Sequence, residues 1–189
     1  MRLDPKEAYK LLSPRLLVLI TTVDSMGGIN AMPTTFIVPI SFKPPLLMVS
    51  ISPRTNTYDN IMWKKEFVVN ILGKEYLDKV LRCGKHYPKG FNKLEQVGLK
   101  WYSSEKLEVP RVKEAKIWIE CKFIGGVKID HIALTDHIPI FGEVVTVDVS
   151  EDIVTEGKVD YTKISQVLHL TGEFFVTDFK ISKHKRYED

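Results

Sequence analysis

Cysteines, long apolar runs and a leader segment are scarce or missing in this sequence. Only two cysteines, Cys83 and Cys121, occur among the 189 residues, and two thiols cannot form a disulfide framework. No apolar run is long enough to span a membrane, and the N-terminus MRLDPKEAYK has no apolar signal core. These absences predict a cytoplasmic protein that does not enter a membrane.

The common nucleotide-binding and hydrolytic motifs are also missing. The patterns GxGxxG, GxxxxGKS/T, GxSxG and HExxH do not occur. Any nicotinamide-dependent chemistry would therefore not run through a Rossmann domain. Charge of one sign is not in large excess either, because the net charge is +3 and the Lys and Arg residues are scattered. Nucleic-acid binding is therefore not indicated.

Length and composition are those of one ordinary globular domain. The apolar fraction is 44% and the charged fraction 27%, and the chain is long enough for a substantial core. The sequence shows no internal repeat and no long linker. We therefore predict a single domain over residues 1–189, in which the charged segment 180–189 is a frayed tail.

Short runs of branched and aromatic residues predict a mainly β protein. The predicted strands are residues 15–23, 29–38, 46–51, 67–72, 115–124, 132–134 and 139–149. A first helix is predicted from Asp4, as N-cap with Glu7 reaching back, to Ser13–Pro14. Further helices are predicted over 57–65, 74–83, 91–97 and 164–170. Because few helices separate the strands, an antiparallel Greek-key barrel is favoured over alternating βαβ units.

A polar turn at residues 52–57, SPRTNT, directly precedes one of these helices. It brings Ser52, Arg54, Thr55 and Thr57 to the helix start. Free N–H groups and the positive end of the helix dipole make such a start suitable for a phosphate, and Arg54 adds a fixed cation. The alternative is that a threonine only caps the helix and that Arg54 is a solvated surface charge.

The segment 30–35, NAMPTT, is a polar interruption in a predicted strand. It contains Asn30, Met32, Pro33, Thr34 and Thr35. Because proline cannot donate to a β-ladder, Met32 and Pro33 must lie at an edge or an irregularity. Freed backbone groups there can meet the polar edge of a flavin ring. An ordinary edge strand with a bulge is the alternative. Because the turn at residues 52–57, which suits a phosphate, is close by in the sequence, we predict FMN as the ligand.

Two charged or titratable residues are weaker candidates. His137, at the start of a predicted strand, can face the mouth of the barrel, although a lone histidine is more often structural. His131 would stand about 20 Å away in an extended chain, too far to share an ion, so no metal site is predicted. Lys93 falls in the first turn of a short predicted helix and is a second candidate cation for a phosphate.

Both cysteines have a structural interpretation. Cys121 lies on the apolar side of an alternating strand, and we expect a buried thiol there. Cys83 follows a predicted helix beside Arg82 and Lys85, whose charges could lower its pKa. An unreactive thiol is nevertheless favoured over a redox-active one.

In their order and spacing, these segments resemble the flavin reductase-like family of FMN-binding split barrels, the group that contains flavoredoxins and archaeal ferric reductases. The resemblance covers nearly the whole chain. It is carried by residues 30–32, 44–46, 52–57, 67–72, 90–94, 136–137 and 142–144. It implies a mainly β, Greek-key split barrel with short peripheral helices.

The resemblance also implies an activity. Family members are typically homodimers with FMN bound non-covalently near the subunit interface, and many pass hydride from NADH or NADPH through FMN to free flavin, ferric complexes or a partner. It places FMN over Met32, Pro33, Thr34 and Thr35, the phosphate near Ser52, Arg54, Thr55, Thr57 and Lys93, and His137 by the ring or the nicotinamide. Hydride would pass directly between stacked rings, so no side chain need act as nucleophile or general base.

Two positions depart from the family pattern, and three rival functions stay open. Thr135 stands where a glycine usually precedes the Asp-His pair, and Asn92 stands where an aspartate commonly precedes Lys93. The first rival is an FMN-binding electron carrier without a nicotinamide site. The others are a split barrel that oxidises a phosphorylated amine and a non-enzymatic barrel that binds a partner.

Overall fold

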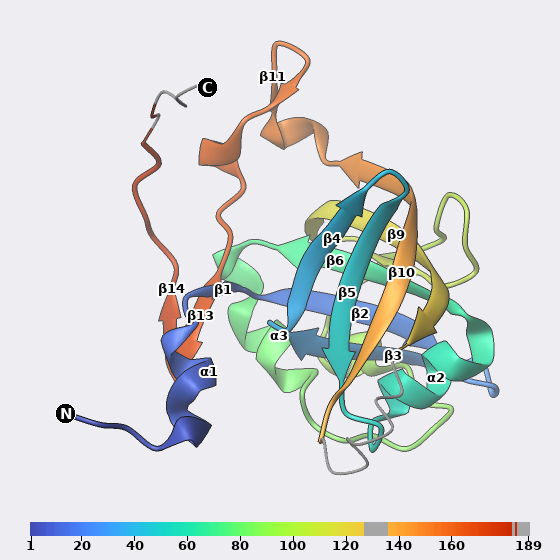
Figure 1. The fold of residues 1–189 in the computed structure, drawn as a ribbon. Coiled ribbons are helices and arrows are strands. Elements are labelled where there is room, and N and C mark those ends of the chain that lie inside the picture. Colours follow the sequence, from blue (N-terminus) through green and yellow to red (C-terminus); the bar gives the residue numbers. More distant parts are fainter. Residues whose placement is uncertain (127–135, 183, 185–189) are drawn as a thin grey trace.

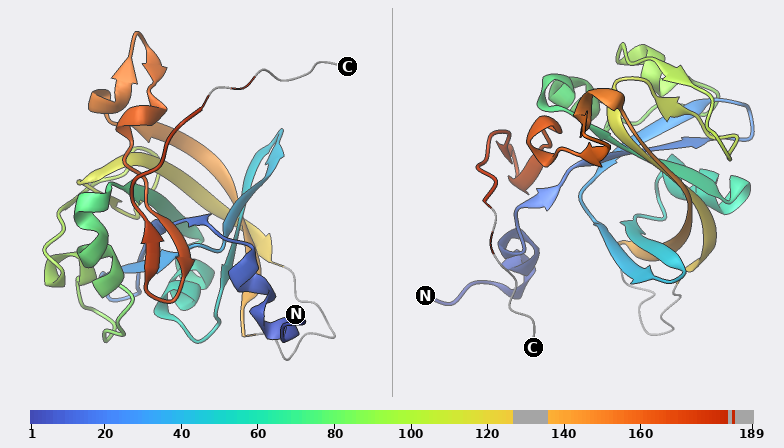
Figure 2. Two further views of the ribbon diagram at one scale, coloured as in Figure 1. Left: turned by 90° about the vertical axis from the view of Figure 1, so that its left-hand side faces the viewer. Right: turned by 90° about the horizontal axis from the view of Figure 1, so that it is seen from above.

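The computed structural model describes residues 1–126, 136–182 and 184. Its centre is an antiparallel seven-stranded sheet that curls into a barrel (Figure 1, Figure 2). The strands are β2 (Val18–Val23), β3 (Ile29–Thr34), β4 (Ile37–Phe42), β5 (Pro45–Ile51), β6 (Glu66–Leu72), β9 (Ala115–Gly126) and β10 (Ile138–Val149). The predicted mainly β barrel is confirmed. The predicted strand 132–134, His131, Thr135 and most of the tail lie outside the described residues.

Two strands that follow each other in the chain lie at opposite edges of this sheet. The strand order is β3-β2-β6-β9-β10-β5-β4, and the chain passes from β3 to β4 through Thr35 and Phe36. A single strand over 29–38 was predicted, and this was wrong. β3 pairs with β2 and β4 pairs with β5, and the Phe36 carbonyl accepts the N–H of Ser50 at 2.9 Å. The barrel is thus split where Thr35 and Phe36 cross from β3 to β4, a segment called the crossing below.

Strand β2 separates two apolar clusters, which explains why Val18, Leu19 and Ile20 are apolar without alternation. Val18 and Ile20 face one cluster, which also contains Phe67 and Cys121. Leu19 faces the other cluster, where it meets residues of the peripheral helices. A strand buried on both faces reads as a continuous hydrophobic run. The prediction that Cys121 is a buried thiol is confirmed.

A second, smaller sheet stands beside the barrel next to the N-terminal helix (Figure 1, Figure 2). It consists of β1 (Arg15–Leu16), β13 (Leu168–Thr171) and β14 (Phe174–Val176), in the order β1-β13-β14. The helix predicted over 164–170 was therefore wrong. The spacing of the apolar residues there fits both the helical repeat and the alternation of a strand. Antiparallel pairing with β1, about 150 residues earlier in the chain, selects the extended form.

The helices are short and peripheral, as predicted. They are η1 (Pro5–Glu7), α1 (Ala8–Leu11), α2 (Asn56–Lys64), η2 (Lys74–Tyr76), α3 (Leu77–Arg82), α4 (Lys93–Gln96), η3 (Glu151–Ile153) and η4 (Tyr161–Lys163). Small strands complete the chain: β7 (Trp101–Tyr102), β8 (Arg111–Val112), β11 (Val154–Thr155) and β12 (Lys158–Val159). Asp4 caps η1 by accepting from Lys6 N, but the Glu7 carboxylate pairs with Lys10 and does not reach back to the cap.

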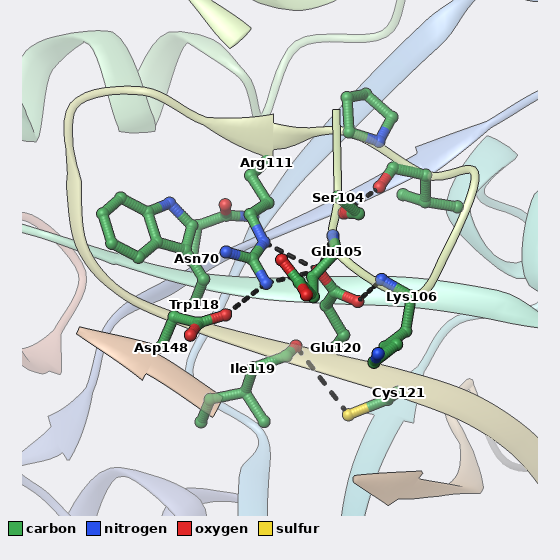
Figure 3. A network of polar contacts seen from close by, with 12 residues as sticks. Asn70, Ser104, Glu105, Lys106, Arg111, Trp118, Ile119, Glu120, Cys121 and Asp148 are labelled. Atoms are coloured by element: carbon green, nitrogen blue, oxygen red, sulfur yellow. Dashed lines mark hydrogen bonds and ion pairs between the residues drawn. The ribbon is translucent and has the colours of Figure 1, made fainter. Parts of the chain in front are cut away.

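A buried ion pair fixes the segment around β7 and β8 to the outside of the barrel (Figure 3). Arg111 Nε donates to Glu120 Oε1 at 2.7 Å, and its guanidinium also pairs with Asp148. The Glu120 carboxylate accepts two further bonds, from the backbone N–H groups of Glu105 and Lys106. Because the buried charges are paired and the Glu120 oxygens have several donors, we interpret this cluster as structural.

The described ranges contain neither a candidate membrane-spanning helix nor a candidate metal cluster. Among those residues no helix is long and apolar enough to cross a membrane. Within the same part of the chain, no three or more His, Cys, Asp or Glu side chains gather in a way that could hold a metal ion.

Candidate functional site

Two pockets open along the edge strand β3, one on each side of its centre. The first, here called the α2 pocket, has a volume of about 210 Å³ and is lined by Asn30, Met32, Arg54, Thr55, Asn56, Thr57, Cys83, Gly84, Lys85, His86 and Lys93. The second, here called the hairpin pocket after the hairpin formed by β13 and β14, has a volume of about 310 Å³ and is lined by Leu17, Pro33, Thr34, Thr35, Phe36, Leu81, His137, His169, Gly172 and Phe175. Consecutive β3 residues, Met32 and Pro33, belong to different pockets. Pro33 of the hairpin pocket also lies next to Gly84 of the α2 pocket, where a Cβ added to the glycine would be 3.5 Å from Pro33 Cγ, so the two pockets are neighbours.

The α2 pocket is electropositive. Arg54, Lys85 and Lys93 line it, and no carboxylate is among its lining residues in the described part of the chain. It opens at the first turn of α2, where backbone N–H groups have no partner within the helix. A helix start with cations around it favours an anion such as a phosphate.

Lys93 is a buried cation in this pocket. Its side chain stems from the first residue of α4, and the residue as a whole is 7% exposed. Its Nζ donates to the Cys83 carbonyl at 3.1 Å and lies 5.5 Å from the centre of the Tyr87 ring. Burial lowers the pKa of Lys93, because the ammonium loses hydration. An anion in the pocket would compensate for that loss.

Asn30 and Thr57 hold β3 and α2 together at the base of the α2 pocket. Asn30 Nδ2 donates to Thr57 Oγ1 at 2.8 Å and to Thr22 Oγ1 at 3.2 Å, and all three residues are buried. The Thr57 hydroxyl accepts this bond and keeps its own proton to donate. Two predicted site residues that are 27 positions apart in the sequence are thereby in direct contact.

The other residues of the polar turn differ in their roles. Thr55 is the N-cap of α2: its hydroxyl accepts from Tyr58 N at 3.3 Å and donates to the Ser52 carbonyl at 2.8 Å. The capping interpretation therefore applies to Thr55, although it still lines the pocket. Arg54 is exposed and lines the pocket as well, whereas Ser52 is absent from the lining.

The hairpin pocket contains the remaining predicted residues. Pro33, Thr34 and Thr35 come from β3 and the crossing, and the prediction that Met32 and Pro33 lie at a sheet edge is confirmed. The pairing of β3 with β2 contains no register shift, so no bulge is needed there. His137 lies edge-on to Phe36, with ring centroids 5.5 Å apart.

The His137 ring is also tied to its neighbour in the sequence. His137 Nδ1 lies 3.0 Å from Asp136 Oδ1. The hydrogen bond and the charge of His137 lower the pKa of Asp136, and Arg54 lowers it further. Arg54, from the turn that lines the α2 pocket, thus acts on the residue next to His137, which lines the hairpin pocket.

Several lining residues were missed by the sequence analysis. In the hairpin pocket these are Leu17, Phe36, Leu81, His169, Gly172 and Phe175. His169 lay inside a helix that was predicted wrongly, so nothing in the sequence indicated that its side chain contacts Phe175. In the α2 pocket, Asn56 and residues 83–86 were missed, although the latter lie directly after a predicted helix.

Cys83 lines the α2 pocket as a buried thiol. Burial raises the pKa of Cys83 to about 11, and the nearby Lys93 lowers it only in part. The expectation that Arg82 and Lys85 could lower this pKa was wrong, because the loss of hydration dominates. The thiol is therefore protonated at neutral pH, in line with an unreactive role.

The donor set along β3 fits FMN. The α2 pocket supplies cations, a hydroxyl and helix N–H groups for a phosphate. Pro33, Thr34 and Thr35, on the β3 side of the hairpin pocket, supply apolar and hydroxyl surfaces for a flat ring with a polar edge. Ligand sites usually measure roughly 300–1,000 Å³. The α2 pocket alone is smaller than that, so a bound flavin would extend from it across β3.

Comparison with known proteins shows what the chain is similar to. The family described as "Flavin reductase like domain" matches residues 12–175. An uncharacterised protein of Aquifex aeolicus (strain VF5) is 33% identical over 96% of this chain and 95% of its own length. The matched range of the family contains every residue that lines the two pockets.

Solved structures show the same similarity. Nitrilotriacetate monooxygenase component B from Bacillus cereus superposes with a TM-score of 0.84 at 26% identity, covering 97% of this chain and 98% of that chain. Flavoredoxin of Desulfovibrio vulgaris (Miyazaki F) superposes with a TM-score of 0.78 at 24% identity, covering 89% and 90%. The barrel and the small sheet beside it are thus a shared arrangement.

Proposed function

The chain belongs to the flavin reductase-like domain family, and on that premise we propose that it is an FMN-dependent oxidoreductase. Bound FMN would supply the redox chemistry, taking hydride from NADH or NADPH and passing electrons to free flavin, a ferric complex or a protein partner. The observation that carries the proposal is the pair of adjoining pockets along β3, one cationic at a helix start and one lined by rings.

The chain's own residues would bind and orient the cofactor. Lys93, Arg54 and the hydroxyl of Thr57, which all line the α2 pocket, would bind the phosphate together with the N–H groups of the first turn of α2. Met32, Pro33 and Thr34 at the open edge of β3, and Thr35 directly after it, would contact the ring. Asn30 would act through Thr57, by fixing the direction of its hydroxyl.

His137 would lie beside the ring or the nicotinamide. Its contacts with Phe36 and Asp136 restrict its orientation at the start of β10. Because direct ring-to-ring hydride transfer needs no side-chain base, its role would be to position a ring and exclude water. His137→Ala should therefore impair binding of a co-substrate more than it alters FMN affinity.

An FMN-binding electron carrier is the second candidate, and the structural likeness to a flavoredoxin favours it. The two candidates differ in whether nicotinamide reduces the bound flavin. The purified protein should be incubated with FMN, desalted and scanned for flavin absorbance, and then treated anaerobically with NADH or NADPH. Bleaching supports the oxidoreductase. A yellow protein that neither donor bleaches supports the carrier, and a protein that retains no FMN refutes both.

The phosphate assignment has its own test. Arg54→Ala or Thr57→Ala should weaken FMN affinity more than it slows turnover of the saturated enzyme, because both side chains would contact the non-reacting end of the ligand. Ser52→Ala is the matched control from the same turn, since Ser52 does not line the pocket. Equal FMN affinity in wild type and both variants would rule out the assignment.

We also propose that the protein is a homodimer. The edge strand β4 exposes three apolar side chains, Val38, Ile40 and Phe42, and Phe42 is 93% exposed. An apolar edge strand left open is a site for association, and a two-fold partner would cover it. Light scattering should give a dimer mass for wild type and a monomer for Ile40→Glu. Val147→Glu, on β10, is the control; a wild-type monomer refutes the proposal.

A further inference from the structure

The small sheet beside the barrel carries a row of three side chains on one face. Arg15 of β1 is directly opposite His169 of β13, and His169 is directly opposite Phe175 of β14. Residues directly opposite each other in antiparallel strands point to the same face. The rings of His169 and Phe175 are in contact, with centroids 4.9 Å apart. Arg15, His169 and Phe175 therefore form a continuous row.

This row faces the crossing between β3 and β4. His169 and Phe175 line the hairpin pocket. Arg15 Nε donates to Thr35 Oγ1 at 3.3 Å, and its guanidinium lies 5.4 Å from the centre of the Phe36 ring. The hairpin thus contributes a wall to the pocket that also contains His137, and β1 connects this wall to the split in the barrel.

The chemistry of the wall suits a flat heteroaromatic ring with an amide edge. Phe175 offers an apolar ring surface. His169 Nε2 lies 3.2 Å from the Gly172 carbonyl, and a carbonyl can only accept, so Nε2 carries the proton. In the neutral ring, Nδ1 then holds the lone pair and can accept an N–H. Carboxamides and cyclic imides supply such a donor.

The hairpin contributes no residue to the α2 pocket. The residues assigned to the FMN phosphate lie on α2, α4 and the turn before α2, and those assigned to its ring lie on β3. The hairpin wall is therefore suited to a second molecule in the hairpin pocket, which would approach the ring held by β3.

We propose that His169 and Phe175 are specificity-determining residues for a planar co-substrate that carries a carboxamide or imide edge. Two molecules share this chemistry: the nicotinamide of the hydride donor and the ring of a free flavin acceptor. The inference rests on the proposed function, because it assumes that FMN occupies the β3 side.

The experiment compares neighbouring aromatic residues on β14. Phe175→Leu keeps apolar volume where Phe175 packs on the core, but removes the flat ring. Phe174→Leu is the matched control, because Phe174 is 69% exposed and does not line the pocket. His169→Ala removes the acceptor, and His169→Asn restores a side chain that can accept an N–H. Thermal unfolding of all four variants checks folding.

Two binding measurements and one kinetic measurement are made on each variant. Fluorescence quenching gives the Kd of FMN, and calorimetry gives the Kd of NAD⁺ or NADP⁺ for the oxidised holoprotein, without turnover. Steady-state assays give the KM of free riboflavin as acceptor. The nicotinamide Kd identifies the donor as the ligand of the wall, and the riboflavin KM identifies the acceptor.

We expect either the nicotinamide Kd or the riboflavin KM to rise about tenfold in Phe175→Leu and in His169→Ala. The first variant loses the ring contact, and the second loses the N–H acceptor. His169→Asn should recover part of the loss, and the FMN Kd should stay within about twofold in all variants. Unchanged constants, an equal effect of Phe174→Leu, or a change confined to FMN affinity would overturn the inference. If wild type binds no FMN, the proposed function itself fails, and the inference fails with it.

Discussion

Replacement of Lys93 by methionine separates the phosphate contact from every other contact with FMN. Lys93→Met keeps an unbranched apolar stem and removes the buried ammonium. If Lys93 binds the phosphate, the variant loses a charge-assisted hydrogen bond, which is worth roughly 1.5–3 kcal/mol. The Kd of FMN should then rise by roughly 10- to 150-fold, at 1.4 kcal/mol for each factor of ten.

The stability of the free protein should respond differently. Burial lowers the pKa of Lys93, so the folded protein holds this charge at an energetic cost that methionine removes. The variant also leaves the Cys83 carbonyl without its donor, a loss of about 1 kcal/mol. These two effects oppose each other. We therefore expect the free energy of unfolding in urea to change by no more than about 1 kcal/mol, while FMN affinity falls.

Riboflavin is the decisive ligand for this variant, because it has the same ring and no phosphate. Fluorescence quenching should show that riboflavin affinity is equal in wild type and Lys93→Met. Lys85→Met is the matched control: Lys85 lines the same pocket but is exposed, and exposed charge pairs contribute only about 0–1 kcal/mol. An equal loss for FMN and riboflavin, or no loss for FMN, would refute the phosphate assignment.

Three further predictions concern buried groups. Glu120→Ala should lower the unfolding free energy by about 3–5 kcal/mol in urea titrations, because it leaves Arg111 buried without its main partner. The double change of Arg111→Met with Glu120→Leu should lower it by less, and an equal loss would contradict the ion-pair interpretation. Burial raises the pKa of Asp24, but the N–H groups of Gly90, Gly28 and Met26 outweigh it and lower the pKa overall. A lowered pKa contributes stability above the unfolded value of 3.8 that is lost as the pH falls, so acid titrations should show a smaller loss of stability for Asp24→Asn than for wild type. Cys83 should react slowly with iodoacetamide at pH 8 in the folded protein and rapidly in urea, since burial raises its pKa to about 11; fast labelling of folded protein would contradict this.

Much of the fold could be predicted from local sequence alone. The strands around Val18–Val23 and Glu66–Leu72 are runs of branched residues, and strand propensity acts over a few neighbours. Pro33 indicated an edge, because the loss of a backbone donor is a local property. The turn before α2 was recognisable for the same reason: capping and charge at a helix start involve residues within one turn.

The site could be predicted only in part, because its pieces meet across long separations. Asn30 and Thr57 were each candidates, but their hydrogen bond is a product of how α2 packs on β3. Lys93 was a candidate cation, but its burial beside the Cys83 carbonyl was not visible in the sequence. Burial also decided the chemistry of Cys83, whose charged neighbours in the sequence suggested the opposite shift.

Local sequence thus specified a β barrel, an edge strand at Met32 and Pro33, and a cationic helix start, because propensity, capping and proline chemistry act between near neighbours. Tertiary packing alone placed β3 and β4 at opposite edges of the sheet and made residues 168–170, which were predicted to be helical, part of the strand β13. It also placed His169 beside Phe175. These outcomes depend on pairing between strands that lie far apart in the sequence, where backbone hydrogen bonds and shared burial outweigh local preference.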